Sequence, residues 1–292
     1  MAKDKFPYMI FSPAKVNLHL KILDRRADGY HNIFSLFQCV SMSDRIWICS
    51  LTEPSDLVDG VDATPGSNTL IKVLNEFRSY TGLDFFAHIR VEKNIPQGAG
   101  LGGGSSNAAS LLKALNEIFS TQLGVDDLIE IGAKVGSDVP FFLKSPAAIV
   151  SGRGEVLKPI RARDDFFIVL VEPGFCVNTS DAYAWLDAYA EGNPGFFDMQ
   201  DPNIEEQYLF FEPEKWDFYN SFLPVLLERF PILLDLERLL RTYGAVYTNV
   251  SGSGSTFFGV FNYESDAHNA CVSLKKKGFS AHCVRPLSFF PG

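Results

Sequence analysis

The sequence predicts a mixed α/β or α+β fold built from two successive groups of strands and helices. Segments with strand-like alternation and segments with helical spacing follow each other along the chain. The length of 292 residues allows one large domain or two modest ones. The composition, with 46% apolar and 21% charged residues, is that of a globular protein rather than a disordered or fibrous one.

The first half of the chain is expected to form a sheet with helices. Residues 11–23 alternate between apolar and polar side chains, which predicts a strand with one buried face, and a charged turn follows at 24–30. A helix over 68–80 can be capped by Ser67 or Asn68, and Gly82 ends it. By the same patterns we expect strands at 33–40, 45–50, 85–93, 147–151 and 155–160, and helices at 105–119 and 126–135.

The second half begins after a charged junction at residues 161–165. Residues 166–172 form an apolar run of the length expected for a buried strand. We then expect helices at 180–191, 222–230, 232–243 and 265–277, a strand, turn and strand within 245–261, and a last strand at 279–284. The predicted division is therefore residues 1–160 and residues 161–292.

The net charge of −9 is concentrated in one place. Ten acidic residues and a single lysine lie between positions 181 and 217, so the rest of the chain is balanced. We interpret this acidic stretch as a solvated insertion. No basic face suggests a nucleic-acid partner.

The five cysteines form no C-x-x-C pair, which disfavours a zinc site or a disulfide framework and favours a reducing cytoplasm. No apolar run approaches the ~20 residues of a membrane span, and the first residues lack the apolar core of a signal peptide. We therefore expect a cytoplasmic protein with no membrane or nucleic-acid partner, acting as a monomer or a weak homodimer.

The strongest local pattern is a glycine-rich turn between a predicted strand and a predicted helix. Glycine allows positive φ and close approach of a large anion, and the free N–H groups of the helix's first turn point at that anion. The pattern predicts a phosphate cradle made of Pro96, Gln97, Gly98, Ala99, Gly100, Leu101, Gly102, Gly103, Gly104, Ser105 and Ser106.

The two common nucleotide-binding motifs do not fit this turn. The P-loop requires lysine before its Ser/Thr, and Gly104 stands there instead. Gly98, Gly100 and Gly103 match the dinucleotide spacing, but the acidic residue at the expected distance, Glu117, lies inside a helix. Tight packing alone is a poor explanation for the turn. Five glycines lose much backbone entropy on folding, and their packing would stabilise the fold too little to offset that loss.

The turn, residues 96–108, resembles the second motif of the kinase superfamily that contains galactokinase, homoserine kinase, mevalonate kinase and phosphomevalonate kinase. Residues 12–18 (SPAKVNL), 26–31 (RADGYH) and 136–142 (GSDVPFF) resemble, within that superfamily, the kinases that act on cytidine diphosphate methylerythritol. Residues 251–255 (SGSGS) stand where the superfamily has its C-terminal glycine-rich motif. The resemblance covers nearly the whole chain and is weakest across the acidic stretch.

The resemblance implies a two-domain α+β fold, with a ribosomal-protein-S5-like first domain, a ferredoxin-like second domain and the active site between them. It implies transfer of the terminal phosphoryl group of ATP to the 2-hydroxyl of the methylerythritol unit, as a step of isoprenoid synthesis. Asp138 would be the catalytic acid-base and Lys15 its partner. Mg²⁺ is expected with ATP, and Ser105 or Ser106 is suggested as its ligand.

For the substrate, the resemblance assigns Asn17 to binding, Tyr30 to stacking on the cytosine ring, and His31 to hydrogen bonding the edge of the ring. Tyr183 is placed, by a looser alignment, as the second stacking aromatic. Two alternatives stay open. One is another kinase of the superfamily, such as homoserine or mevalonate kinase, which would have no use for a base-binding turn. The other is a non-catalytic sensor, which the presence of both Lys15 and Asp138 disfavours.

Overall fold

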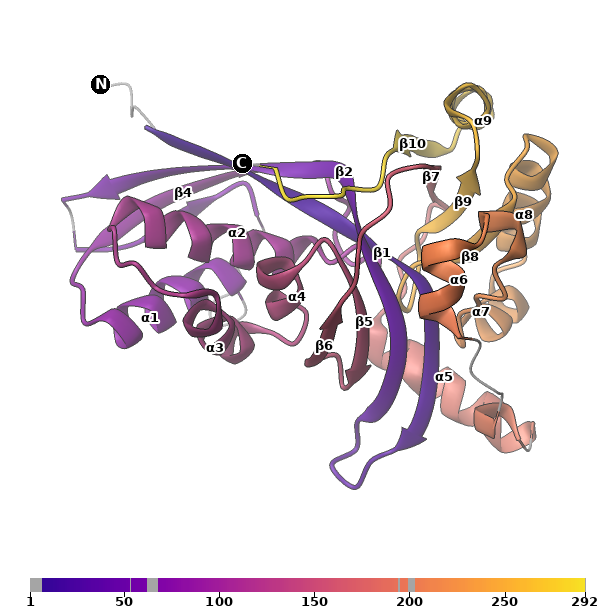
Figure 1. Cartoon of the computed structure of the whole chain (residues 1–292), viewed down its shortest axis with the longest axis horizontal. Coiled ribbons are helices and arrows are strands. Elements are labelled where there is room, and N and C mark those ends of the chain that lie inside the picture. The colour runs from indigo at the N-terminus through magenta and orange to yellow at the C-terminus, as the bar shows by residue number, and fades with distance from the viewer. Residues whose placement is uncertain (1–6, 53, 62–67, 194, 199–202, 292) are drawn as a thin grey trace.

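The computed structural model describes residues 7–52, 54–61, 68–193, 195–198 and 203–291. Two sheets come from opposite halves of the chain (Figure 1). The larger has the order β3-β4-β2-β5-β6, with β1 paired to β2, and the smaller has the order β10-β7-β9-β8. All pairings but β3 with β4 are antiparallel, and helices cover both sheets, so the fold is α+β as expected.

The larger sheet consists of β1 (Tyr8–Arg25), β2 (His31–Leu51), β3 (Leu57–Asp59), β4 (Phe86–Glu92), β5 (Ala147–Gly152) and β6 (Val156–Pro159). Its helices are α1 (Thr69–Thr81), α2 (Gly103–Ile118), α3 (Val125–Val135) and α4 (Val139–Lys144), which lie together on one side of the sheet (Figure 1). Asn68 caps α1 by accepting from the backbone N–H of Leu70 at 2.8 Å, and Gly82 ends it at φ +71°. The other predicted cap, Ser67, lies outside the described residues.

The smaller sheet consists of β7 (Phe167–Glu172), β8 (Tyr247–Val250), β9 (Phe257–Phe261) and β10 (Ser280–Val284). The helices of this half are α5 (Thr179–Gly192), α6 (Ile204–Phe210), α7 (Leu223–Arg229), α8 (Ile232–Thr242) and α9 (Glu264–Lys276). Short 3₁₀ turns at Phe196–Asp198 and Pro213–Lys215 complete it. Among the described residues, no helix combines the length and the apolar character that crossing a membrane requires.

A long hairpin of β1 and β2 joins the two halves (Figure 1). The sequence predicts separate strands at 33–40 and 45–50, and this is wrong, because β2 continues through residues 41–44. Ser43 and Asp44 stay paired there with Pro13 and Ser12 of β1, next to a register shift between Pro13 and Ala14. A bulge thus absorbs the irregularity that looks like a break in the sequence.

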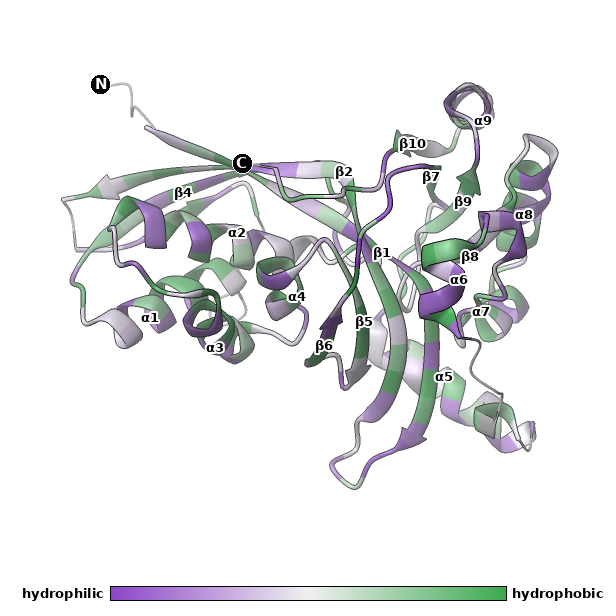
Figure 2. Cartoon of the chain, viewed as in Figure 1, coloured by the Kyte–Doolittle hydropathy of each residue, from purple (hydrophilic) through white to green (hydrophobic). Residues whose placement is uncertain are grey.

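Both faces of β1 are buried, whereas its alternation predicts only one. Lys15, Asn17 and Lys21 expose 5% or less of their surface. Hydrophobic and hydrophilic residues do alternate along the strand (Figure 2), but a second register shift, between Asn17 and His19, changes the face. The apolar side chains before it, such as Val16, share a buried cluster with the smaller sheet, whereas Leu20 joins the cluster that contains the helices.

The acidic stretch is not simply a solvated insertion. Ile204, Tyr208 and Trp216 are 2%, 0% and 6% exposed and belong to the core shared with the smaller sheet. The helix α6 that carries Tyr208 was not predicted. The acidic residues Glu205 and Glu206 make its sequence look polar although one side of the helix is apolar. The helix has seven residues, which is too short for a periodic pattern to identify it.

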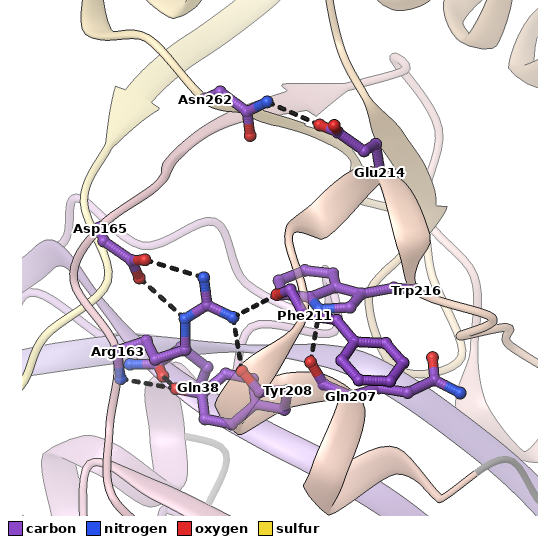
Figure 3. Close-up of polar contacts among 9 residues, drawn as sticks. All are labelled: Gln38, Arg163, Asp165, Gln207, Tyr208, Phe211, Glu214, Trp216 and Asn262. Carbon is purple, nitrogen blue, oxygen red and sulfur yellow. Dashed lines mark hydrogen bonds and ion pairs between the residues drawn. The ribbon is translucent and has the colours of Figure 1, made fainter.

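The charged junction at 161–165 is tied to both halves through Arg163 (Figure 3). The Arg163 guanidinium donates to the carbonyl oxygens of Tyr208 and Phe211 at 2.5 and 2.7 Å, and both its other nitrogens reach Asp165 at 2.8 Å. The Tyr208 hydroxyl then donates to Gln38 of β2 at 2.5 Å. The junction therefore acts as a structural anchor between β2 and α6.

Candidate active site

The glycine-rich turn wraps the beginning of α2. Gly98, Gly100 and Gly102 have φ of +65°, +79° and +69°, a region that other residues rarely adopt. Gly102 stands at the N-cap of α2 without a side chain to cap it, so the first N–H groups of this helix are left for another acceptor. A cavity of about 390 Å³ opens at this point. It is lined by every predicted cradle residue from Pro96 to Ser105.

Ser106 is the predicted cradle residue that the cavity does not include. Its side chain is completely buried, and its hydroxyl oxygen accepts from the Ser12 hydroxyl at 2.8 Å. Ser12 is also 2.7 Å from the Asn107 side-chain oxygen. Of the two serines suggested as metal ligands, only Ser105 therefore lies at the cavity.

The turn at Ser251 to Ser255 packs directly on the cradle. The Ser251 hydroxyl donates to the carbonyl oxygen of Gly100 at 2.9 Å and accepts from the backbone N–H of Asn17 at 3.2 Å. The backbone N–H of Thr256 donates to Ala99 at 3.3 Å. A Cβ on Gly100 would overlap the carbonyl oxygen of Ser251, so close backbone approach explains that glycine.

Two further features of the cavity were missed from the sequence. Lys93 lines it and forms an ion pair with Asp44, which is completely buried. Asp44 also accepts from the backbone N–H groups of Asn94 and Ile95, each at 2.8 Å, and so fixes the segment that leads into the cradle. The sequence does carry one signal for Asp44, because it is a single acidic residue between the predicted strands at 33–40 and 45–50. Thr69, at the start of α1, also lines the cavity.

Lys15 lies next to the cradle. Its backbone N–H donates to the carbonyl oxygen of Leu101 at 3.0 Å, and a Cβ on Gly102 would lie 3.0 Å from its Cγ. The ammonium donates to Asn17 Oδ1 at 2.6 Å and stands 4.4 Å from the centre of the Phe37 ring. Burial lowers the pKa of Lys15, and the nearby Asp138 carboxylate partly opposes this shift.

Asp138 completes this arrangement from the start of α4. Its Oδ2 is 3.9 Å from Lys15 Nζ, and 30% of its side chain is exposed. Although Asp138 occupies the N-cap, its carboxylate makes no capping hydrogen bond, so it remains available to a ligand. A Cβ on Gly154 would lie 3.6 Å from Oδ1, an ordinary van der Waals distance, so Gly154 is a near neighbour of the carboxylate. The structure thus brings the two predicted catalytic residues together beside the cradle.

The short helix α4 was not predicted, and a lysine compensates for its abrupt end. In a longer helix the carbonyl oxygen of Phe142 would accept from residue 146, but Pro146 has no N–H. Lys113 of α2 supplies the missing donor at 2.8 Å. The Phe290 ring covers its ammonium at 3.8 Å, and burial lowers the pKa of Lys113 to about 8.

Replacing Lys113 with methionine is expected to lower the free energy of unfolding by about 1–2 kcal/mol, because the Phe142 carbonyl loses its donor in a buried place. Urea unfolding measures the difference. Lys134→Met is the control, since Lys134 pairs with Glu130 at a solvent-exposed position, where such pairs contribute roughly 0.5 kcal/mol or less. Equal losses in the two variants would contradict the capping role.

Two of the predicted base-binding residues, His31 at the start of β2 and Tyr183 of α5, lie against each other. The His31 ring is stacked on Tyr183, with ring centres 5.0 Å apart and 20° between the planes, and Tyr183 stands edge-on to Phe222. Burial, and to a lesser degree the Asp138 carboxylate, raises the pKa of Tyr183 to about 12. Tyr30 is 60% exposed and its ring faces the Arg153 guanidinium at 5.1 Å.

Asp187 was missed in this region. Its Oδ1 is 2.8 Å from His31 Nε2, and its Oδ2 is 3.7 Å from Arg25. Nothing in the sequence separates Asp187 from the other acids of its stretch.

Asn17, the remaining residue predicted to bind the substrate, lies elsewhere. It donates to Ser35 Oγ at 3.0 Å and lies with Lys15 rather than with the aromatic residues.

Comparison with known proteins gives matches in both halves of the chain. Residues 68–145 match the GHMP kinases N terminal domain, and residues 212–280 match the GHMP kinases C terminal family. The first match contains the cradle and Asp138, and the second contains the turn at Ser251 that packs on the cradle.

Relatives match along most of the chain. The 4-diphosphocytidyl-2-C-methyl-D-erythritol kinase of Thermodesulfovibrio yellowstonii is 36% identical over 260 residues, covering 88% of this chain and 90% of that protein. The enzyme of the same name from Thermotoga maritima is 37% identical over 256 residues, covering 86% and 91%.

Comparison with solved structures agrees with these sequence matches. A crystal structure of 4-(cytidine 5'-diphospho)-2C-methyl-D-erythritol kinase has a TM-score of 0.81 at 30% identity, covering 98% of this chain and all of that one. The homoserine kinase of Cytophaga hutchinsonii, with a TM-score of 0.72 at 17% identity over 95% of this chain and 93% of that one, shares the fold. With both of its halves matched and relatives well above 30% identity, this chain belongs to the GHMP kinases and, within them, to the 4-diphosphocytidyl-2-C-methyl-D-erythritol kinase family.

Proposed function

We propose that this protein transfers the γ-phosphoryl group of ATP to the 2-hydroxyl of 4-(cytidine 5'-diphospho)-2-C-methyl-D-erythritol, in the synthesis of isoprenoid precursors. The observation that carries the proposal is the contact between the cradle and the catalytic pair. Lys15 touches the cradle through its backbone and its side chain, and its ammonium is 3.9 Å from Asp138. An anion in the cavity and a hydroxyl at Asp138 would therefore be adjacent.

The cradle would hold the phosphates of ATP. The first residues of α2 line the cavity and have no side-chain cap, and the helix dipole favours negative charge there. Lys93 adds a positive charge on the wall, held in place by Asp44. Because phosphoryl transfer has a loose transition state, such positioning and charge stabilisation supply most of the rate.

The proposed transfer step uses the pair of Lys15 and Asp138. The substrate hydroxyl oxygen forms a bond to the γ-phosphorus, the bond from that phosphorus to the β–γ bridging oxygen breaks, and ADP leaves. The Asp138 carboxylate accepts the proton of the hydroxyl as the new bond forms. The Lys15 ammonium, 3.9 Å from Asp138, balances charge on the transferring group. Asn17 and Phe37 hold that ammonium in place.

Mg²⁺ in kinases is held largely by phosphate oxygens, with few protein ligands and several waters. The described residues contain no group of three His, Cys, Asp or Glu side chains able to hold a metal. They do place the Ser105 residue at the cavity, which suits an ion carried mainly by the nucleotide. Ser105 would then hold the ion, which would neutralise charge on the β- and γ-phosphates.

The base of the substrate would bind beside Tyr30, His31 and Tyr183, with the two tyrosines stacking on cytosine and His31 bonding to its edge. The Asp138 carboxylate contributes to the raised pKa of Tyr183, so these two residues are close enough to interact electrostatically. The Tyr30 ring is accessible to a ligand, since 60% of its surface is exposed.

Replacing Tyr30 with alanine is expected to raise KM for the cytidine substrate by about tenfold, because base–aromatic stacking contributes ~1–3 kcal/mol per base. KM for ATP should change by less than about twofold, since Tyr30 does not line the cradle cavity. Steady-state kinetics with each substrate varied in turn measures both. Equal changes in the two KM values would count against a cytosine clamp.

A substrate panel tests the function itself. The pure protein is incubated with ATP, Mg²⁺ and, in turn, the cytidine diphosphate substrate, homoserine and mevalonate, and the products are read by phosphorus NMR. Phosphorylation of homoserine or mevalonate in preference to the cytidine substrate would make the chain another kinase of the superfamily. ATP binding without any phosphorylated product would make it a sensor.

We further propose that residues 1–160 and 161–292 form two domains with the active site between them, and that the protein acts in the cytoplasm as a monomer or a weak homodimer. The origin of the two sheets in these two segments supports the division. The five cysteines form no disulfide, which agrees with a reducing compartment.

A further inference from the structure

The His31 imidazole is held on two sides by α5. Tyr183 stacks on its face at 5.0 Å, and Asp187, one helical turn later, approaches Nε2 at 2.8 Å. Only 4% of the His31 side chain is exposed, whereas Asp187 exposes 28%. A ring fixed at its face and at one nitrogen cannot turn freely, so its remaining nitrogen, Nδ1, points in a defined direction.

The partner of Nε2 decides what Nδ1 can do. An ionised carboxylate can only accept a hydrogen bond, so Nε2 must carry the hydrogen that lies between it and Asp187. In a neutral imidazole the other nitrogen then has a lone pair and no hydrogen. In its neutral form, His31 therefore presents an acceptor at Nδ1.

We propose that Asp187 is a positioning residue that makes His31 select a pyrimidine edge bearing an amino group over one bearing a carbonyl group. The inference rests on the proposed function, because it takes His31 to face the base. Cytosine carries an exocyclic amino group, which can donate to Nδ1. Uracil carries an oxygen in the same place, and two acceptors facing each other leave a buried group without a partner.

A second charged residue, Arg25, lies close to Asp187. The Arg25 guanidinium is 3.7 Å from Oδ2, the oxygen that His31 does not use, and 64% of the Arg25 side chain is exposed. An asparagine at this position would lose that attraction. Its amide could also turn to offer an N–H to Nε2, which would move the ring hydrogen to Nδ1 and make His31 a donor. Asp187→Asn therefore releases the constraint on the ring without removing the ring.

The test compares the cytidine diphosphate and uridine diphosphate forms of the methylerythritol substrate. In the wild-type protein we expect kcat/KM to favour the cytidine form by at least about tenfold, the effect of roughly one well-made hydrogen bond. In Asp187→Asn we expect this ratio to fall at least about fivefold, mainly through KM, with kcat on saturating cytidine substrate largely kept. Glu191→Gln is the matched control. It removes a carboxylate one turn further along α5, beside the same surface cavity, and should keep the wild-type ratio.

A second measurement reads the ring without any turnover. Nitrogen NMR of ¹⁵N-histidine protein, with the His31 signals assigned through His31→Gln, distinguishes a protonated from an unprotonated ring nitrogen. We expect protonated Nε2 and unprotonated Nδ1 in the wild type, and a changed pattern in Asp187→Asn. A hydrogen on Nδ1 in the wild type, or an unchanged substrate ratio in Asp187→Asn, would overturn the inference. Failure of the wild type to phosphorylate the cytidine substrate would instead sink the proposed function.

Discussion

Replacing Asp138 with asparagine is expected to lower kcat by roughly 10²–10⁴-fold, the usual contribution of a positioned general base. Asparagine has nearly the same shape but cannot take the proton of the attacking hydroxyl. It also removes the charge that faces Lys15 at 3.9 Å. The cradle does not include residue 138, so the affinity for ATP should stay within a few-fold of the wild type. Coupled detection of ADP gives kcat, and calorimetric titration with a non-hydrolysable ATP analogue gives the affinity.

Asp84→Asn serves as the control for this prediction. Asp84 is an exposed aspartate between α1 and β4, so the substitution makes the same chemical change away from Lys15. Near-normal kcat in Asp138→Asn would remove Asp138 from the role of base. A large loss of ATP affinity would mean that the carboxylate supports the cradle rather than the transfer step.

Replacing Gly100 with alanine is expected to lower the free energy of unfolding by about 3–5 kcal/mol. A non-glycine residue at its φ of +79° costs roughly 1–2 kcal/mol by itself. The new Cβ would also overlap the carbonyl oxygen of Ser251 and lie 2.9 Å from the carbonyl carbon, both backbone atoms that cannot move cheaply. Urea unfolding without nucleotide measures the loss.

Gly98→Ala separates the two causes. Gly98 lies in the same turn with φ +65°, but a Cβ there would meet nothing within 4 Å. Its variant should lose only the roughly 1–2 kcal/mol that positive φ costs. If Gly100→Ala proves no less stable than Gly98→Ala, the packing of the Ser251 turn on the cradle is looser than the structure indicates.

The features that could be predicted from the sequence are those that depend on residues close together along the chain. Alternation located most strands, helical spacing located seven of the helices named above, and a glycine cluster located the phosphate cradle. The short helices α4 and α6 escaped because six or seven residues cannot display a period of 3.6, and Pro140 and the acids of α6 obscured what remained.

Features that depend on distant residues could not be predicted in the same way. The burial of Lys15 and Asn17 requires partners on both sides of β1, which alternation does not report. The contact of His31 with Asp187 spans 156 positions, and Asp187 looks like any solvated acid of its stretch. The residues of the proposed catalytic pair, Lys15 and Asp138, were assigned by family resemblance, whereas their 3.9 Å approach is a property of the fold.

The dependence of the cradle on Ser251 has a consequence during protein synthesis. The ribosome makes the cradle at residues 96–105 long before it reaches the turn that braces Ala99 and Gly100 from behind. A nascent chain that ends before residue 251 therefore carries the glycines without their support. The growing polypeptide can brace the proposed cradle in this way only after the ribosome has added Ser251.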